Sequence, residues 1–229
     1  MQIPTAPPTA PPVVEILGRS SSHYTRMVRL LAHALGVDYT LRPIHDLMSE
    51  QPATFAGNPA LKLPALRIGD AARTHVYWGS TNACRQLARL VPGGEARVFW
   101  PEQANAQLDG PLLANAHEVL AHAMAAQVEV VFHEVVSQRA ADAASRKRRR
   151  SLELCLAWLD AELDAIHAAL PTGRIALFDL GLFCLLEHLP FRNPMDLSGH
   201  PRLTAFAAAF AARPEARATP YAFDPRPED

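Results

Sequence analysis

The chain has 229 residues, 49% of them hydrophobic and 20% charged, a composition that predicts a globular protein of one or two domains. Its 22 basic and 23 acidic side chains nearly cancel, which excludes a general electrostatic attraction to nucleic acid or to an anionic membrane. We therefore expect neutral or small partners, with no nucleic acid and no membrane among them.

The N-terminus and the cysteines indicate the compartment. Residues 1–12 hold five prolines and lack the features of a secretory signal, so we expect a disordered or extended tail. The longest apolar stretch, residues 175–189, is shorter than the ~20 residues of a spanning helix. Cys84, Cys155 and Cys184 lie far apart in apolar surroundings, which favours core positions over disulfides. The sequence thus predicts a cytoplasmic protein.

The first half of the chain alternates short strands with helices. Residues 13–17 have the pattern of a strand, and residues 24–35 repeat apolar side chains at helical spacing until Gly36 ends the helix. Residues 39–43 have the pattern of a second strand. A strand, a helix and a strand in this order imply a parallel pair of strands.

Pro64 stands in a run that otherwise has the pattern of a short apolar strand. Proline cannot donate to a sheet ladder, so Pro64 must lie at the first residue of a strand, at an edge or in a bulge. An X-Pro bond prefers trans by only ~0.5–1 kcal/mol, so we expect a cis Leu63–Pro64 bond that presents the Leu63 backbone to a ligand. The elements expected next are strands at 65–68 and 75–77, a turn at Gly69 and Asp70 between them, and a helix at 80–90.

Beyond residue 92 the pattern becomes helical throughout. Apolar spacing predicts an amphipathic helix over residues 151–170, a helix buried on all sides over 177–189 and a last helix over 201–212. The predicted fold is therefore an α/β domain followed by an all-helical one. We place the tail at 1–12, the first domain at 13–92 and the second at 93–229.

Three segments of the chain carry a family resemblance. Residues 16–28 run from a strand through three serines into a helix, residues 58–66 surround Pro64, and residues 78–88 hold a turn at a helix start. In this order they resemble the glutathione S-transferase family, which uses such segments to place a catalytic serine or cysteine and to hold the cysteinyl and γ-glutamyl parts of glutathione. The resemblance implies a thioredoxin-like βαβ-ββα domain followed by an all-α domain.

The serines at the first helix are candidate activators of the glutathione thiol. Unpaired amides and the dipole at a helix N-terminus stabilise an anion such as a thiolate. If Thr25 takes the place of the second cysteine in a thioredoxin-like Cys-x-x-Cys turn, Ser22 takes the first, so Ser22 is the predicted catalytic residue and Ser21 the second choice. The alternative is that these serines only cap the helix.

The resemblance also implies a set of glutathione-binding residues. The set consists of Lys62 for the glycyl carboxylate, Leu63 and Pro64 for the cysteinyl part, and Ser80 and Thr81 for the γ-glutamyl group. Gly79 stands where the family usually has an acid that contacts the γ-glutamyl amine, and losing that contact predicts an affinity lower by about tenfold or more. A second departure is Ala176, which lacks the hydroxyl of the family's capping box, although Asp179 keeps its acidic half.

Two further motifs favour ordinary helix residues. His117 and His122 lie five positions apart, whereas two metal ligands on one helix face need i, i+4 spacing, so we predict no metal site. The basic run at residues 146–150 is short and lies just before the expected amphipathic helix. We interpret it as a solvated helix face rather than a nucleic-acid patch.

The resemblance implies an enzyme. On that basis we expect a homodimeric glutathione transferase for detoxification, with glutathione as co-substrate, that adds the thiol to an apolar electrophile. The alternative is a non-catalytic binding or interaction protein with a weakened glutathione site, which Gly79 favours. A thiol reductase would need a cysteine at the helix start, and the chain has none between Ser20 and Arg26. The candidates for the electrophile pocket between the two halves are Tyr24, Asn105, Leu108, Leu112, Asn115, His117 and Met124.

Overall fold

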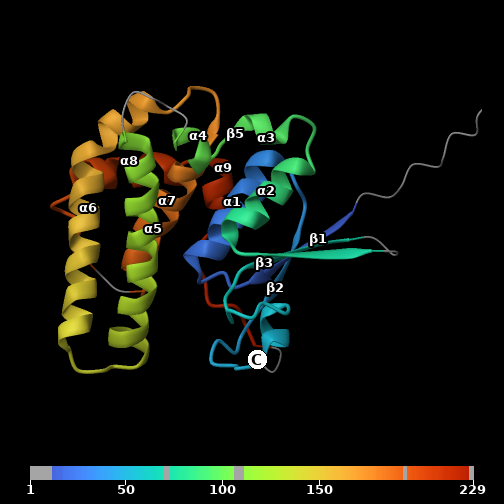
Figure 1. Cartoon of the computed structure of the whole chain (residues 1–229), viewed down its shortest axis with the longest axis horizontal. Helices are drawn as coiled ribbons and strands as arrows, with labels where there is room; N and C mark the ends of the chain where they lie inside the picture. Colours follow the sequence, from blue (N-terminus) through green and yellow to red (C-terminus); the bar gives the residue numbers. More distant parts are fainter. Residues whose placement is uncertain (1–11, 70–72, 106–110, 193–194, 227–229) are drawn as a thin grey trace, which may run out of the picture.

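The computed structural model describes residues 12–69, 73–105, 111–192 and 195–226. A sheet with its helices lies beside a group of longer helices (Figure 1). The predicted tail, apart from Pro12, lies outside the described residues, and so does Asp70 of the predicted turn.

The N-terminal sheet has four strands in the order β2-β1-β3-β4. Strand β1 (Val13–Gly18) is parallel to β2 (Thr40–Pro43) and antiparallel to β3 (Ala65–Gly69), which is antiparallel to β4 (Thr74–Trp78). The predicted thioredoxin-like order βαβ-ββα, with its parallel first pair, is confirmed.

One carboxylate joins three of these strands. Val14 and Ile16 on β1 are buried, whereas Glu15 between them points to the other face of the sheet. Its Oε1 accepts from Arg42 Nε on β2 and its Oε2 accepts from Arg67 Nη1 on β3, both at 2.7 Å. These two hydrogen bonds hold the pKa of Glu15 below its usual value.

Two helices pack against the sheet. Helix α1 (His23–Leu35) buries the apolar face that its spacing predicts and ends at Gly36, whose φ of 71° lies in the left-handed region that favours glycine. Helix α2 (Ser80–Arg89) buries Cys84 and Leu87 in the same core. A short 3-10 helix, Pro52–Phe55, precedes the cis proline.

The second half consists of helices and one pair of two-residue strands. In chain order its elements are α3 (Gly94–Arg97), β5 (Val98–Phe99), α4 (Pro101–Asn105), α5 (Leu112–Val130), a π-helical segment (Val131–Val136), α6 (Ala143–Ala169), β6 (Ile175–Ala176), α7 (Leu177–Arg192), α8 (Pro201–Ala211) and α9 (Pro214–Arg217). The expected helical second domain is thus confirmed as a fold class.

Helix α6 begins earlier than its apolar pattern predicts. Asp142 and Ser145 form a reciprocal capping box, in which Asp142 Oδ1 accepts from Ser145 N at 2.7 Å and Ser145 Oγ accepts from Asp142 N at 2.9 Å. The basic run at 146–150 therefore lies inside the helix, and its expected place before the helix is wrong. Arg148 and Arg149 of this run form ion pairs with Glu129 and Glu134, on α5 and on the π-helical segment after it.

Helix α5 with its π-helical continuation, Leu112–Val136, is long and apolar enough to cross a membrane by length and composition alone. It packs against α6 and α7, with Leu113, Leu120 and Met124 buried in the second core. Such packing is typical of a core helix in a helical domain.

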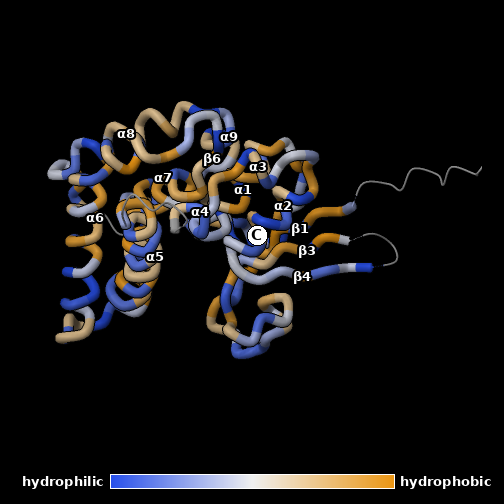
Figure 2. The backbone as a smooth tube through the Cα atoms, turned by 45° about the horizontal axis from the view of Figure 1, so that its top comes forward, coloured by the Kyte–Doolittle hydropathy of each residue, from blue (hydrophilic) through white to orange (hydrophobic). Residues whose placement is uncertain are grey.

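The two halves share helix α7. Hydrophobic residues run along β1, β3 and α7 (Figure 2). Leu177, Leu180 and Phe183 of α7 belong to the core beneath the sheet, and Leu182 and Leu185 belong to the core between the long helices. The predicted boundary between residues 92 and 93 stays a prediction, since Val98 and Trp100 also enter the first core.

The structure gives the burial of the three cysteines and the contact that Asp179 of the incomplete capping box makes. Cys84 and Cys184 are fully buried, whereas Cys155 is only partly buried at the margin of the second core, so its expected core position is wrong. The Oδ1 atom of Asp179 lies 3.1 Å from Nε2 of His167. The acidic half of the box thus contacts a neighbouring helix.

Buried and partly buried histidines lie where the helices meet. Burial lowers the pKa values of His117 and His188 to about 4 and lowers the pKa of His23 well below its usual value. The rings of His23 and His188 contact each other edge to face, with centroids 4.7 Å apart. His117 packs edge to face on Phe178 in the second core.

These histidines predict a loss of stability in mild acid. As the pH falls from about 6.5 towards 4, the unfolded chain binds protons that the folded chain does not, so the free energy of unfolding decreases. Each histidine contributes up to ~1.4 kcal/mol per pH unit within this window and nothing above it. We expect urea unfolding followed by circular dichroism to give a clearly lower midpoint at about pH 5 than at about pH 7.

A matched pair of variants assigns the effect. His117→Gln is expected to flatten the dependence of stability on pH, because it removes one partly buried histidine whose pKa is lowered in the folded protein. His122→Gln removes an exposed histidine from the same helix and is expected to leave the slope as in the wild type. A free energy of unfolding that stays constant over this range would contradict the assignment.

Candidate functional site

The serine loop joins β1 to α1. Ser22 is the N-cap of α1, and its Oγ accepts a hydrogen bond from Thr25 N at 3.3 Å. Ser20 and Ser21 are each only 7% exposed, whereas Ser22 is partly exposed. The capping expected of these serines is therefore present at Ser22, which is also the most exposed of the three residues.

Thr25 holds the loop against the helix. It is fully buried, and its Oγ1 accepts from Arg19 N at 3.3 Å. Gly18 makes this close approach possible, because a Cβ at this position would lie 2.4 Å from Thr25 Oγ1. Ser22 N donates to Arg19 O at 3.1 Å, which completes a tight turn before the helix.

The Leu63–Pro64 bond is cis, as the sequence predicts. Strand β3 begins at Ala65, so Leu63 lies just before the ladder, at the end of an inner strand of the sheet. Asn58 shapes the approach to this bond, because its Nδ2 donates to Lys62 O at 2.9 Å and its Oδ1 accepts from Ala60 N at 3.0 Å.

Strand register brings the three predicted segments together. Ala65 is the partner of Leu17 on β1 and of Trp78 on β4, and both pairings are antiparallel. The residues that follow Leu17 and Trp78 therefore face the residue that precedes Ala65. Consistent with this, Gly79 N donates to Pro64 O at 2.9 Å. The serine loop, the cis proline and the start of α2 thus meet at one end of the sheet.

The start of α2 has no side-chain cap. Gly79 is the N-cap, with φ 85° and ψ 152° and no side-chain capping bond. Ser80 is half-buried at the first helical position and Thr81 is exposed. No acidic residue lies in the first turn, so this helix end favours an anion. Lys62 is also exposed, before the cis proline.

The expected electrophile residues are only partly brought together. Tyr24 packs against the second core next to the serine loop, and burial raises the pKa of its hydroxyl. Leu112 and His117 are partly buried, Met124 is buried and Asn115 is exposed. The side chain of Asn105 and all of Leu108 lie outside the described residues.

Sequence reasoning missed the residues that hold the serine loop from the helical half. Asp224 Oδ2 accepts from Ser20 N at 2.9 Å, and His188 Nε2 lies 3.2 Å from Ser21 O. His188 is one of three polar side chains in the mostly apolar 177–189 segment, with Asp179 and Glu187, and this was a usable signal for it. No local pattern points to Asp224, which lies 204 positions from Ser20.

Metal ligands do not gather in the part of the chain that the structure describes. No group of three or more His, Cys, Asp or Glu side chains there is arranged to hold a metal ion. His122 lies 4.0 Å from Glu118 on the exposed side of α5, and His117 points into the core.

Comparison with solved structures identifies the fold. A glutathione transferase family member from Pseudomonas fluorescens Pf-5, crystallised with glutathione, is 24% identical with a TM-score of 0.70, over 91% of this chain and 99% of that one. A glutathione S-transferase from Methylobacillus flagellatus with glutathione bound is 20% identical with a TM-score of 0.66, over 91% and 100%. Glutathione S-transferase III in its apo form is 24% identical with a TM-score of 0.67, over 94% and 100%.

Sequence comparison gives a narrower result. A comparison with curated proteins finds no significant match. Residues 21–90, from the serine loop to the end of α2, match the family described as Glutathione S-transferase, N-terminal domain. The chain therefore has the glutathione S-transferase fold, and its residues 21–90 match the N-terminal domain of that family.

Proposed function

We propose that this chain is a glutathione transferase in which the Ser22 hydroxyl activates the thiol of glutathione for addition to an apolar electrophile. The observation that carries the proposal is the place of Ser22, at the N-terminus of α1 and at the sheet end that also holds the cis proline and the start of α2. Two structural relatives carry glutathione, which supports this ligand.

The Ser22 hydroxyl has the hydrogen-bonding capacity that thiol activation needs. A serine hydroxyl donates once and accepts twice. One acceptor position is used by Thr25 N, so the hydroxyl proton remains for the sulfur of glutathione. Its hydrogen bond and the N-terminal amides of α1 stabilise the thiolate, which lowers the thiol pKa and raises the fraction of nucleophile at neutral pH. The thiol proton passes to solvent, and the thiolate sulfur then forms a bond to the electrophilic carbon, which releases halide when the electrophile is an aromatic halide.

The rest of glutathione would extend along the same sheet end. The amide and carbonyl of Leu63 pair with the cysteinyl part, since a strand end beside a cis proline leaves them free of the ladder. Ser80, Thr81 and the first amides of α2 receive the γ-glutamyl carboxylate. Lys62 is exposed and directly precedes Leu63, and it would bind the glycyl carboxylate.

A second candidate function is a non-catalytic glutathione-binding or interaction protein. Gly79 favours it, because no carboxylate at the start of α2 can pair with the γ-glutamyl amine. Such a protein would keep the fold but would bind glutathione weakly and would not catalyse its transfer. Glutathione affinity and turnover separate the two functions.

We further propose a cytoplasmic homodimer that serves detoxification, with domains at 13–92 and 93–229 after the 1–12 tail. Apolar side chains exposed along α5 and the π-helical segment support a second copy of the chain, and these are Val128, Phe132, Val135 and Val136. Sedimentation of the purified protein is expected to give twice the mass of one chain. The mass of a single chain would contradict the dimer.

Replacing Ser22 is expected to remove the activating hydrogen bond. A hydrogen bond to a charged group is worth ~1.5–3 kcal/mol, so Ser22→Ala should lower kcat/KM with an aromatic halide by about 10- to 100-fold and raise the thiol pKa of bound glutathione by about 1–2 units. Ser22→Thr keeps a hydroxyl and should retain most of the activity. The thiol pKa is measured from the ultraviolet absorbance of the thiolate.

Ser21→Ala is the matched control, because it removes a neighbouring buried hydroxyl. It is expected to leave turnover close to the wild type. If Ser21→Ala loses activity and Ser22→Ala does not, the transferase function stands and the role of Ser22 is wrong. If calorimetry detects no binding of glutathione up to several millimolar, the enzyme hypothesis is wrong.

Restoring an acid at position 79 is expected to tighten glutathione binding. A Cβ there meets nothing within 4 Å, although the positive φ costs any residue except glycine ~1–3 kcal/mol of stability. Gly79→Glu should bind glutathione about tenfold more tightly than Gly79→Ala, which carries the same backbone strain without the carboxylate. Equal affinities of the two variants in calorimetry would show that the missing acid does not limit binding.

A further inference from the structure

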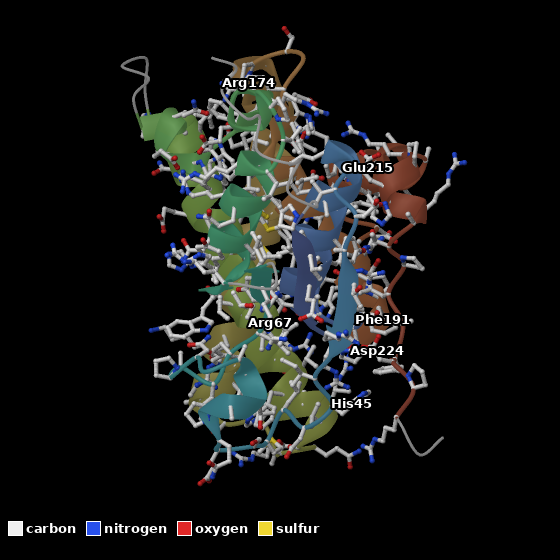
Figure 3. The ribbon with its side chains drawn as sticks, turned by 90° about the vertical axis from the view of Figure 1, so that its right-hand side faces the viewer. His45, Arg67, Arg174, Phe191, Glu215 and Asp224 are labelled. Carbon is white, nitrogen blue, oxygen red and sulfur yellow. The ribbon has the colours of Figure 1, made fainter. Side chains whose placement is uncertain are left out.

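The C-terminal segment returns to the serine loop. After α9 the chain leaves the helical half and runs down to the N-terminal half, and Asp224 lies close to Phe191 of α7 (Figure 3). Asp224 is half-buried, and its Oδ2 accepts from Ser20 N at 2.9 Å. A carboxylate from the end of the chain thus binds a main-chain amide two residues before Ser22.

Aromatic contacts anchor this segment on α7 and α1. The Tyr221 hydroxyl donates to Cys184 O at 2.6 Å, and the Tyr221 ring stacks on Phe191 with centroids 5.2 Å apart. The Arg26 guanidinium lies 4.3 Å from the centre of the Tyr221 ring, and the Phe223 ring lies 5.1 Å from Phe191. Asp224 is therefore held at the end of a packed segment.

A second residue of the helical half holds the next peptide of the loop. His188 Nε2 lies 3.2 Å from Ser21 O, and His188 Nδ1 lies 3.4 Å from Gln127 Nε2. A carbonyl oxygen only accepts, so Nε2 carries the hydrogen and Nδ1 accepts from the amide of Gln127. His188 in this tautomer is neutral, in keeping with its low pKa.

These two contacts bind the amide of Ser20 and the carbonyl of Ser21, in the turn that precedes Ser22. Ser20 is 7% exposed, so without the Asp224 carboxylate its amide would be buried without this partner. The turn would then relax and move the Ser22 Oγ. Activation of a thiol depends on this atom lying within hydrogen-bond reach of the sulfur.

We propose that Asp224 and His188 are positioning residues that hold the Ser20–Ser21 backbone so that Ser22 faces the sulfur of glutathione. This inference rests on the proposed role of Ser22. It assigns a role in the chemistry of the N-terminal half to the segment that follows α9. Neither residue is placed in contact with glutathione, so we expect them to affect kcat more than the affinity for glutathione.

The test compares Asp224→Ala with Asp224→Asn. The asparagine amide keeps an oxygen that accepts from Ser20 N, so Asp224→Asn should retain most of the turnover. Asp224→Ala should lower kcat by about tenfold to a hundredfold with little change in the calorimetric affinity for glutathione. Asp196→Ala is the control, because Asp196 likewise accepts from a serine amide, Ser198 N at 2.8 Å, in a loop of the helical half.

Hydrogen exchange gives a readout that needs no turnover. The Ser20 amide should be protected in the wild type, lose that protection in Asp224→Ala and keep it in Asp224→Asn. An unprotected Ser20 amide in the wild type overturns the positioning role without any variant. Full turnover by Asp224→Ala, or equal losses in Asp224→Ala and Asp224→Asn, also overturns it. Absence of turnover in the wild type itself would instead defeat the proposed transferase function.

Discussion

The candidate site depends on the register of three strand ends. Leu17, Ala65 and Trp78 are partners across β1, β3 and β4, so the residues one step further along meet around Pro64. A slip of β3 by one residue would turn Leu66 from the core to the other face and would separate Pro64 from Gly79. The buried side chains that fix the register therefore also bring the polar backbone together at this end of the sheet.

The helical half supplies what the sheet cannot. Strand pairing brings the serine loop to the right end of the sheet, but it leaves the amide of Ser20 and the carbonyl of Ser21 to find partners elsewhere. Those partners come from the C-terminal segment and from α7. The geometry around Ser22 thus draws on contacts from both ends of the chain, and the fold of each half is insufficient to explain it alone.

Much of the fold followed from local patterns in the sequence. Strand and helix limits in the first half are correct to within about a residue or two, because alternation, helical spacing and Gly36 are short-range signals. Helix α6 was placed eight positions late, since its first turns are basic and its start is marked only by the Asp142–Ser145 box. The small β5–β6 pair was missed because two residues carry no periodicity.

The site was predictable where it is made of contiguous residues. The serine loop, the cis proline and the start of α2 each have a local signature, and the order of strands explains why they converge. Asp224 could not be found in this way, because its contact spans 204 positions and depends on how Tyr221 and Phe223 pack. A polar contact of this length has no period, and for Asp224 the sequence around it gives no local signal.

The shared core has a consequence for how the protein can be divided. The apolar cluster under the sheet includes Val98 and Trp100, and also Leu177 and Phe183 from a helix late in the chain. A fragment that ends at residue 92 would keep α1 and α2 over its sheet, but it would expose to water the apolar surface of α1 that packs against α7. The thioredoxin-like half is a recognisable evolutionary unit, yet physically the two halves are expected to melt as one cooperative body, so neither half can be exchanged as an independent module.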